Sequence, residues 1–131
     1  MDDPILLAHG GGGSAMRELI ENVIRPELSG LPADLPDASP IPGVSGVVLT
    51  TDSFVVKPLF FRGGDIGSLA VHGTINDLAM AGARPLALAL SLIVEEGFSQ
   101  NTLRSIVRSA AHAAEACGVS IVTGDTKVAA R

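Results

Sequence analysis

The last two-thirds of the chain alternate between helix-like and strand-like segments, and this alternation limits the fold more than any other feature does. Apolar residues at helical spacing predict helices over Ile66–Ala81 and Gln100–Cys117. Apolar runs bounded by turn residues predict strands over Pro85–Glu95 and Val119–Thr123. Because helices and strands that alternate along a chain form packed layers, we expect a helix-covered sheet of the α/β or α+β class.

The N-terminal third predicts two further strands and one further helix. β-branched residues predict a strand over Val44–Thr51 and a short one over Val55–Lys57. Ser14 can cap a helix in which apolar residues recur at helical spacing. We therefore expect one domain over residues 14–131, preceded by a flexible, glycine-rich segment over residues 1–13.

The composition says more about possible functions of the chain than about its fold. Of the 131 residues, 47% are apolar and 18% are charged, so we expect the domain to bury surface against another chain. The net charge of −5 gives no reason to expect nucleic-acid binding. No apolar run reaches the roughly 18 residues of a membrane span. A single cysteine and the lack of a signal-peptide pattern fit a cytoplasmic location.

Three short segments each place one carboxylate at the edge of an apolar run. Asp52 and Asp125 each follow a predicted strand, and Asp77 lies within a predicted helix. Mg²⁺ prefers hard oxygen ligands and keeps some of its waters, so three converging carboxylates suit a magnesium ion shared with a polyphosphate. The segments therefore favour magnesium-nucleotide binding.

Each carboxylate also has a simpler interpretation. Asp52 can form an Asx-turn that shapes the connection between two strands. Asp77 and Asn76 are poor formers of a helix interior and can belong to an exposed polar stripe. Asp125 can form a surface ion pair with Lys127, because residues two apart in an extended segment project to the same side. In the nucleotide-binding interpretation Lys127 contacts phosphate instead.

A glycine run before the first predicted helix offers a second phosphate-binding feature. It consists of Gly10, Gly11, Gly12 and Gly13. Free backbone amides at the start of a helix attract phosphate. The run lacks the Gly-Lys-Ser/Thr ending of a Walker A loop, and no strand precedes it as in a Rossmann fingerprint. The alternative interpretation is a flexible tail.

Taken together and in their order, the three acidic segments resemble those of the HypE family of hydrogenase maturation proteins. That family belongs to the PurM-like superfamily of aminoimidazole ribonucleotide synthetase, selenophosphate synthetase and thiamine-monophosphate kinase. The resemblance runs from about His9 to Val128 and covers the N-terminal, ATP-binding half of such a protein. Four more segments carry it: His9-Gly10-Gly11-Gly12-Gly13, Pro58-Leu59-Phe60-Phe61, Gly82-Ala83-Arg84-Pro85 and Glu95-Glu96-Gly97.

The resemblance implies an α+β fold in which a mixed four-stranded sheet carries helices on one face. It also implies a homodimer that joins the sheets of two copies. ATP and Mg²⁺ are the implied cofactors, with Asp52, Asp77 and Asp125 as metal ligands. Asn76, Lys127 and the glycine run are the further nucleotide contacts. Asp77 and Lys127 are the candidate catalytic residues.

Proteins of the HypE family use ATP to dehydrate a thiocarbamate on their own C-terminal cysteine to a thiocyanate, which supplies the cyanide ligands of nickel–iron hydrogenase. The implied partners are the carbamoyl donor HypF and the HypC–HypD scaffold. We interpret the end at Arg131 as a truncation that removes the C-terminal domain and its cysteine. Cys117 lies within the fold and cannot replace that cysteine, so we expect the 131-residue chain to be inactive alone. Two alternatives stay open: a domain of another PurM-like small-molecule kinase or synthetase, and a dimerisation module without catalysis.

Overall fold

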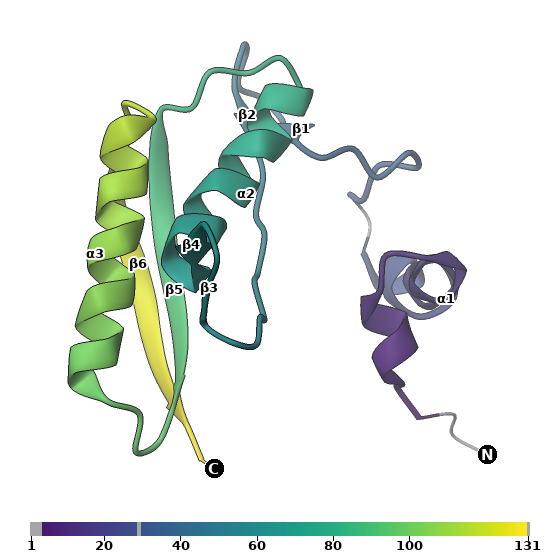
Figure 1. Ribbon diagram of the computed structural model, residues 1–131. Coiled ribbons are helices and arrows are strands. Elements are labelled where there is room, and N and C mark those ends of the chain that lie inside the picture. The colour runs from purple at the N-terminus through teal and green to yellow at the C-terminus, as the bar shows by residue number, and fades with distance from the viewer. Residues whose placement is uncertain (1–3, 29, 131) are drawn as a thin grey trace. The chain divides into compact units, whose positions relative to one another are not determined.

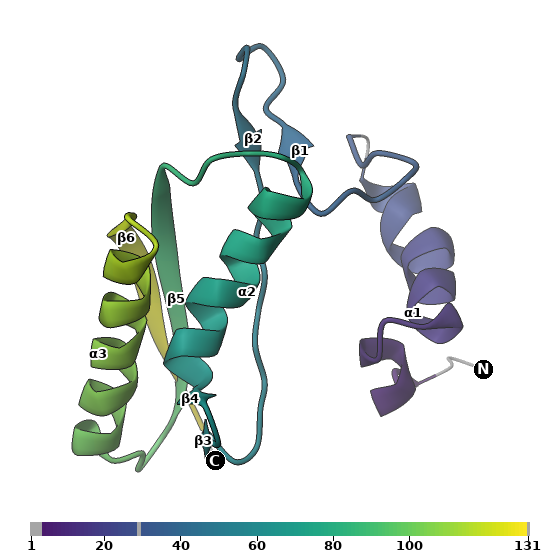
Figure 2. The ribbon, with the colours of Figure 1, turned by 45° about the horizontal axis from the view of Figure 1, so that its top comes forward.

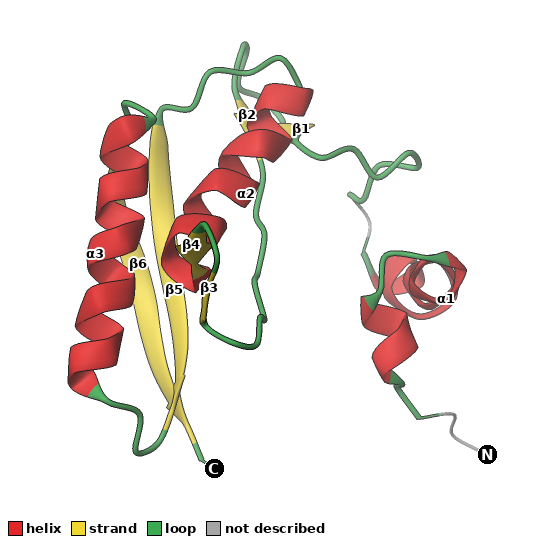
Figure 3. Cartoon of the chain, viewed as in Figure 1, coloured by secondary structure: helices red, strands yellow, loops and turns green. Residues whose placement is uncertain are grey.

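The computed structural model describes residues 4–28 and 30–130. By internal contacts the chain divides into two compact units, Met1–Pro36 and Asp37–Arg131. Figure 1 labels the helices and strands of both units, and Figure 3 separates helix, strand and loop by colour. Among the described residues, none of the helices has the length and apolar content that crossing a membrane requires.

Most of the first unit consists of short helical segments that follow one another along the chain. It begins with a 3-10 turn at Leu7–Gly10 and continues as α1, Ser14–Leu19. A π-helical stretch, Ile20–Ile24, and a 3-10 turn, Arg25–Glu27, follow directly. The helix predicted to begin at Ser14 is therefore present, but its N-cap is the preceding glycine.

The side chain of Arg25 forms hydrogen bonds with the proline-rich segment that follows this helix. Its Nη1 donates to the carbonyl oxygens of Leu31 and Pro32 at 3.3 and 3.1 Å, and its Nη2 donates to that of Ala33 at 3.3 Å. Its Nε lies 2.7 Å from a carboxylate oxygen of Glu21 one turn earlier. The guanidinium group thus satisfies three carbonyls that lie outside regular structure, which explains how a loop of this composition keeps a defined path.

The second unit contains three two-stranded sheets, of which two are short antiparallel pairs and one is a long parallel pair. The first short pair is β1 (Ser39–Pro40) with β2 (Val48–Leu49), and the second is β3 (Phe60–Phe61) with β4 (Gly64–Asp65). The long pair is β5 (Ala87–Glu95) with β6 (Ser120–Ala129).

Two helices, α2 (Ile66–Met80) and α3 (Gln100–Ala116), pack on each other and against β5 and β6. Parallel strands need a crossover, and α3 supplies it between β5 and β6. Successive residues of β5 alternate between exposed and half-buried. This alternation is typical of a sheet with one covered face and one open face. Figures 1 and 2 show the helix α3 beside the two long strands in both views.

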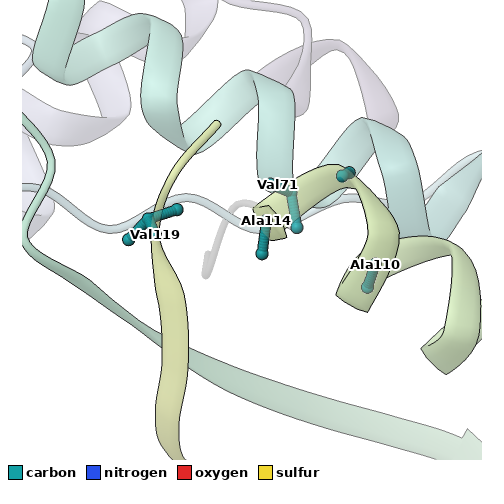
Figure 4. Close-up of a cluster of buried hydrophobic side chains, with 5 residues drawn as sticks. Val71, Ala110, Ala114 and Val119 are labelled. Carbon is teal, nitrogen blue, oxygen red and sulfur yellow. The ribbon is translucent and has the colours of Figure 1, made fainter. Parts of the chain in front are cut away.

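The core of the second unit is small and consists mostly of short side chains (Figure 4). Half-buried apolar residues from α2, β5 and β6 pack around it. Alanine at three positions of α3 lets the neighbouring helix and strands approach closely, because it adds little side-chain volume. The buried residues of this cluster are Val71, Ala110, Ala113, Ala114 and Val119.

The ends of both helices carry capping groups. Asp65 accepts hydrogen bonds from the amides of Gly67 and Ser68 at 2.7 and 3.0 Å, and the Ser68 hydroxyl accepts one from the Asp65 amide at 3.0 Å. These bonds form a reciprocal capping box at the start of α2. After the two helices, Gly82 and Gly118 both have a φ of 66°. A glycine in the left-handed conformation thus follows the end of each helix.

Strand β6 is longer than the sequence predicts. We expected it to end at Thr123 before a break at Gly124 and Asp125, but it continues to Ala129. A register shift next to Leu88 adjusts the pairing, and a Cβ added at Gly124 would overlap the backbone of Leu90. The glycine therefore allows the two strands to approach closely instead of ending β6.

The mixed four-stranded sheet expected from the resemblance is not formed within residues 37–130, where the sheets stay separate. Of the strand predicted over Val44–Thr51, only Val48–Leu49 is paired. The residues Val55–Lys57 belong to none of the described strands, and Lys57 lies in a bend. β-Branched residues favour an extended backbone, but a ladder also needs a neighbouring strand that the local sequence does not specify. The side chain of Val55 is accordingly fully exposed.

Candidate functional site

Asp77 meets the segment that follows β2 near the C-terminal end of α2. The Thr50 hydroxyl lies 3.2 Å from Oδ2 of Asp77 and 2.6 Å from the carbonyl oxygen of Asp37. Asp77 is half-buried, although it stands within the last turn of its helix. This contact joins residues 27 positions apart in the sequence.

The electrostatic setting of Asp77 is unfavourable for a carboxylate without a cation. The C-terminal end of a helix carries a partial negative charge, and a basic residue nearby normally offsets it. The last turn of α2 contains no basic residue. The Thr50 hydroxyl has one proton for two acceptors, and the carbonyl of Asp37 is the nearer of them. The last turn of α2 therefore offers Asp77 no positive charge of its own.

Asp52 lies two residues after Thr50, in the same extended segment. Its side chain is exposed, and Oδ1 accepts a hydrogen bond of 2.7 Å from the amide of Ser53. This bond goes to the next amide, so it is not the Asx-turn of the simpler interpretation, which uses the amide two residues on. Asn76 is exposed on α2, immediately before Asp77. The structure therefore gathers Asp77, Thr50 and the Asp52 segment in one region.

Asp125 and Lys127 form an ion pair on β6. The Lys127 Nζ lies 2.9 and 2.8 Å from the two carboxylate oxygens, and both side chains are mostly exposed. In the strand register Asp125 is opposite Ser91 and Lys127 is opposite Ile93, which are exposed positions of β5. The pair thus lies on the face of the sheet that the helices leave open. The same-side projection expected from the sequence is present.

The structure does not gather all the predicted metal ligands. Within the described residues, no three side chains of His, Cys, Asp or Glu lie close enough together to hold one metal ion. Asp77 is joined by the segment that contains Asp52, whereas Asp125 is paired with Lys127 on the open face of the sheet. The site formed by three carboxylates therefore stays a prediction.

The glycine run lies in the first unit, between the 3-10 turn and α1. Gly12 has a φ of 74°, a conformation that favours glycine, and Gly13 is the N-cap of α1. Before the run, the Leu6 amide donates to Nδ1 of His9 at 2.8 Å. The run is exposed throughout. Its expected role over phosphates is untested, and residues 1–3 of the expected flexible segment lie outside the described residues.

Two residues of this region were not identified from the sequence as part of a site. Thr50 belonged to the first acidic segment but was given no role of its own, and Phe54 was not singled out. The signal for Phe54 lay in Gly73, a glycine inside a predicted helix, which indicates close packing. A Cβ added at Gly73 would overlap the Phe54 ring. The glycine thus marks where the segment after β2 packs on α2.

A separate hollow lies between the end of α3 and the start of β6. Its volume is about 490 Å³, and Glu115, Gly118 and Ser120 are among its lining residues. None of the predicted nucleotide contacts lines it. Nearby, Cys117 packs against the core, with its Sγ 3.7 Å from Nδ1 of His72. This packing agrees with a structural role for the cysteine.

Comparison with known proteins places the chain in a family. Residues 36–131 match the family of AIR synthase related proteins, in the region described as the N-terminal domain. The chain belongs to this family. Among curated relatives, it is 52% identical over 134 residues to the carbamoyl dehydratase HypE of Rhodobacter capsulatus, covering 99% of this chain and 39% of that protein. It is 43% identical to the carbamoyl dehydratase HypE of Escherichia coli K12, covering 97% of this chain and 40% of that protein.

Solved structures agree with this assignment. A crystal structure of a HypE–HypF complex matches with a TM-score of 0.78 and 47% identity, over 91% of this chain and 37% of the other. A crystal structure of HypE in complex with ATP matches with a TM-score of 0.64 and 45% identity, over 98% of this chain and 38% of the other. The expected resemblance to HypE proteins is confirmed. The chain spans about two-fifths of the length of these curated relatives, 39% and 40% in the two cases.

Proposed function

We propose that this chain is the ATP-binding and dimerisation part of a HypE-type carbamoyl dehydratase. The observation that carries the proposal is the likeness to a HypE structure in complex with ATP, at 45% identity over 98% of this chain. Asp77 supports it independently, because a half-buried carboxylate at the negative end of a helix favours a cation nearby. A magnesium nucleotide supplies such a cation.

In the whole protein, the proposed reaction is the ATP-dependent dehydration of a thiocarbamate on a C-terminal cysteine. The amide oxygen is activated as a phosphate ester, and the loss of phosphate leaves a thiocyanate for the cyanide ligands of nickel–iron hydrogenase. The proposed partners are HypF and the HypC–HypD scaffold. HypF is present in the HypE–HypF crystal structure to which this chain is similar. We propose a cytoplasmic location for this chemistry. The 131-residue chain alone is expected to bind nucleotide without turning it over.

The donor atoms of the site fit Mg²⁺. Asp52 and Asp77 supply carboxylate oxygens from one region, and hard oxygen donors are what this ion prefers. In the proposal Asp125 supplies a third carboxylate, and Lys127 turns from it to a phosphate. An exposed ion pair contributes only about 0–1 kcal/mol, so opening the Asp125–Lys127 pair costs little. The bound Mg²⁺ would neutralise charge on the phosphoryl oxygens.

The remaining proposed contacts come from α2 and from the first unit. Asn76 would contact the nucleotide beside Asp77, and Gly10, Gly11, Gly12 and Gly13 would cover the phosphates. The amides of the glycine run are suited to this because the run is exposed and leads into α1.

We also propose that two copies join through their sheets, as the resemblance implies. Large apolar side chains remain exposed on β5, β6 and the segment after β2, which is unusual for a monomer. Burial of this surface in a dimer would account for the high apolar fraction of the chain. The exposed residues include Val55, Ile93, Val122 and Val128.

Calorimetric titration of the chain with ATP in the presence of Mg²⁺ tests the nucleotide site. We expect Asp77→Asn to abolish the binding, since the amide removes the charge but keeps the size of the side chain. Asp34→Asn is the matched control, because Asp34 is an exposed carboxylate of the first unit that the proposal does not use. Equal affinity of the Asp77→Asn variant and the unaltered chain would contradict the metal role.

A dimerisation module that does not bind nucleotide is the second candidate function. The ion pair of Asp125 with Lys127, and the lack of a group of three ligands in the described part of the chain, favour it. It predicts a dimer in sedimentation experiments together with no heat of binding for ATP and Mg²⁺. A dimer that does bind the nucleotide supports the first proposal.

A further inference from the structure

The segment after β2 comes into direct contact with α2 at Gly73. A Cβ added at Gly73 would overlap the Cζ and Cε1 atoms of Phe54, so the aromatic ring lies directly on the helix backbone. Phe54 is half-buried, whereas the next residue, Val55, is fully exposed. The ring is therefore an apolar anchor in a segment whose neighbouring residue contacts nothing apolar.

Two contacts hold this segment against one side of the helix. Gly73 and Asp77 are four residues apart on α2 and therefore lie on the same side of it. Phe54 packs on the first and Thr50 contacts the second, so the segment runs antiparallel to the helix. Asp52 lies between these two contacts in the sequence. Its position relative to Asp77 is thus limited from both sides.

Strand pairing does not hold this part of the chain. Within the described residues, the segment between β2 and β3 is loop throughout (Figure 3). The carboxylate of Asp52 contributes only a bond to the amide of Ser53, its neighbour in the chain. The Phe54 ring and the Thr50 hydroxyl therefore supply contacts where backbone ladders are absent.

The choice of glycine at position 73 is also informative. Glycine destabilises a helix interior relative to alanine, so α2 would be more stable with alanine there if the space were free. The space is occupied by the ring of Phe54. Glycine at position 73 therefore lowers the stability of α2 relative to alanine, but it leaves room for the aromatic ring to contact the helix backbone.

We propose that Phe54 and Gly73 are positioning residues, and that their contact sets the segment so that Thr50 and Asp52 lie beside Asp77. The consequence for Mg²⁺ and ATP rests on the proposed function, whereas the contact and its effect on Thr50 do not. Neither residue touches the nucleotide. Both act through the placement of Asp52 and Thr50.

The sign of the effect of Gly73→Ala tests the contact. Helix propensity alone predicts a higher melting temperature for this variant. The proposal predicts a lower one, because the new methyl group and the ring cannot occupy the same space. In a Phe54→Ala background the same substitution should raise the melting temperature, since the ring is gone. A rise in both backgrounds would overturn the proposal.

The positioning role needs a readout that lost stability alone does not change. We expect Phe54→Ala to raise the Mg²⁺ concentration required for half-maximal ATP binding, measured by titration below the melting temperature of the variant. Val55→Ala is the matched control, because it shortens an exposed apolar side chain of the same segment. If Phe54→Ala lowers the melting temperature but leaves the Mg²⁺ requirement and the ATP affinity unchanged, the contact is only structural and the proposal fails.

An NMR measurement separates failure of this proposal from failure of the proposed function. The Phe54 ring should shift the resonances of the Gly73 Hα protons, and Thr50 should show nuclear Overhauser effects to α2 in the absence of nucleotide. Phe54→Ala should remove both signals, and Val55→Ala should keep them. If the unaltered chain binds no ATP, the proposed function fails while these signals still decide the positioning role. Thr50 effects that persist in Phe54→Ala would contradict it.

Discussion

At the scale of single residues, the structure assigns different tasks to two buried or half-buried carboxylates. Asp65 is buried, and its carboxylate accepts hydrogen bonds from amides at the start of α2, where the helix dipole is positive. Asp77 lies at the opposite end of the same helix, where a carboxylate is disfavoured. The capping bonds account for the first carboxylate, whereas for the second we propose a nearby cation.

We expect Asp65→Ala to lower the free energy of unfolding by about 1–2 kcal/mol, the usual effect of losing an N-cap side chain. The variant leaves the amides of Gly67 and Ser68 without their acceptor. Urea denaturation followed by circular dichroism measures the change. Asp34→Ala, at an exposed carboxylate, should stay close to the unaltered chain. An equal decrease in the free energy of unfolding of both variants would contradict a stabilising role of the Asp65 cap.

Lys127→Ala should separate binding from stability. Because the Lys127–Asp125 pair is mostly exposed, its loss should change the free energy of unfolding by less than about 1 kcal/mol. In the proposed site the same variant should weaken ATP binding, because a phosphate contact is lost. Thermal melting and calorimetric titration of one preparation measure both effects. Unchanged ATP affinity would leave Lys127 as a surface charge.

At the scale of elements, the sequence pattern predicted the helices well and the strands poorly. The predicted helices agree with α2 and α3 to within a residue or two at each end, because capping residues and helical spacing are encoded nearby. The strand Val44–Thr51 was mostly wrong, because pairing depends on a distant neighbour. The end of β6 was missed for the same reason, since only the backbone of Leu90 shows why Gly124 continues the strand.

The site follows the same division. Asp77 could be singled out because a carboxylate next to Asn76 is unfavourable within a helix. Its contact with Thr50 could not be predicted, because it joins segments brought together only by tertiary packing. The convergence of Asp125 with the others remains a prediction that rests on resemblance.

The packing of α2 on α3 gives a prediction at this scale. A Cβ added at Gly67 would overlap the carbonyl oxygen of Ile106. We expect Gly67→Ala to destabilise the chain by about 1–3 kcal/mol through overpacking, although alanine is the better helix former. Denaturant unfolding measures the change, and Gly10→Ala, where a Cβ has open space, is the control. A more stable Gly67→Ala variant would contradict the close approach.

At the scale of the whole molecule, the open face of the β5–β6 sheet is the feature that most needs a partner. Apolar side chains and one ion pair remain exposed there, while α2 and α3 cover the other face. Together with the family assignment, this favours a chain that completes itself in an assembly. The glycine run lies in the first unit and the site around Asp77 in the second.

We expect the chain to sediment as a dimer at micromolar concentration and the variant Ile93→Asp to sediment as a monomer. Ile93 is 79% exposed, so the substitution should leave the folded monomer intact while placing a charge on the proposed interface. Leu7→Asp, at a side chain that is 97% exposed in the first unit, is the control. A monomeric unaltered chain, or a dimeric Ile93→Asp variant, would contradict dimerisation through this face.

The central claim is that the chain binds ATP through a divalent cation. Its most direct test is one calorimetric titration of the unaltered chain with ATP, performed with Mg²⁺ and repeated with excess EDTA. The account predicts saturable binding with Mg²⁺ and none with EDTA. Absence of binding in both titrations, or equal binding in both, would contradict it.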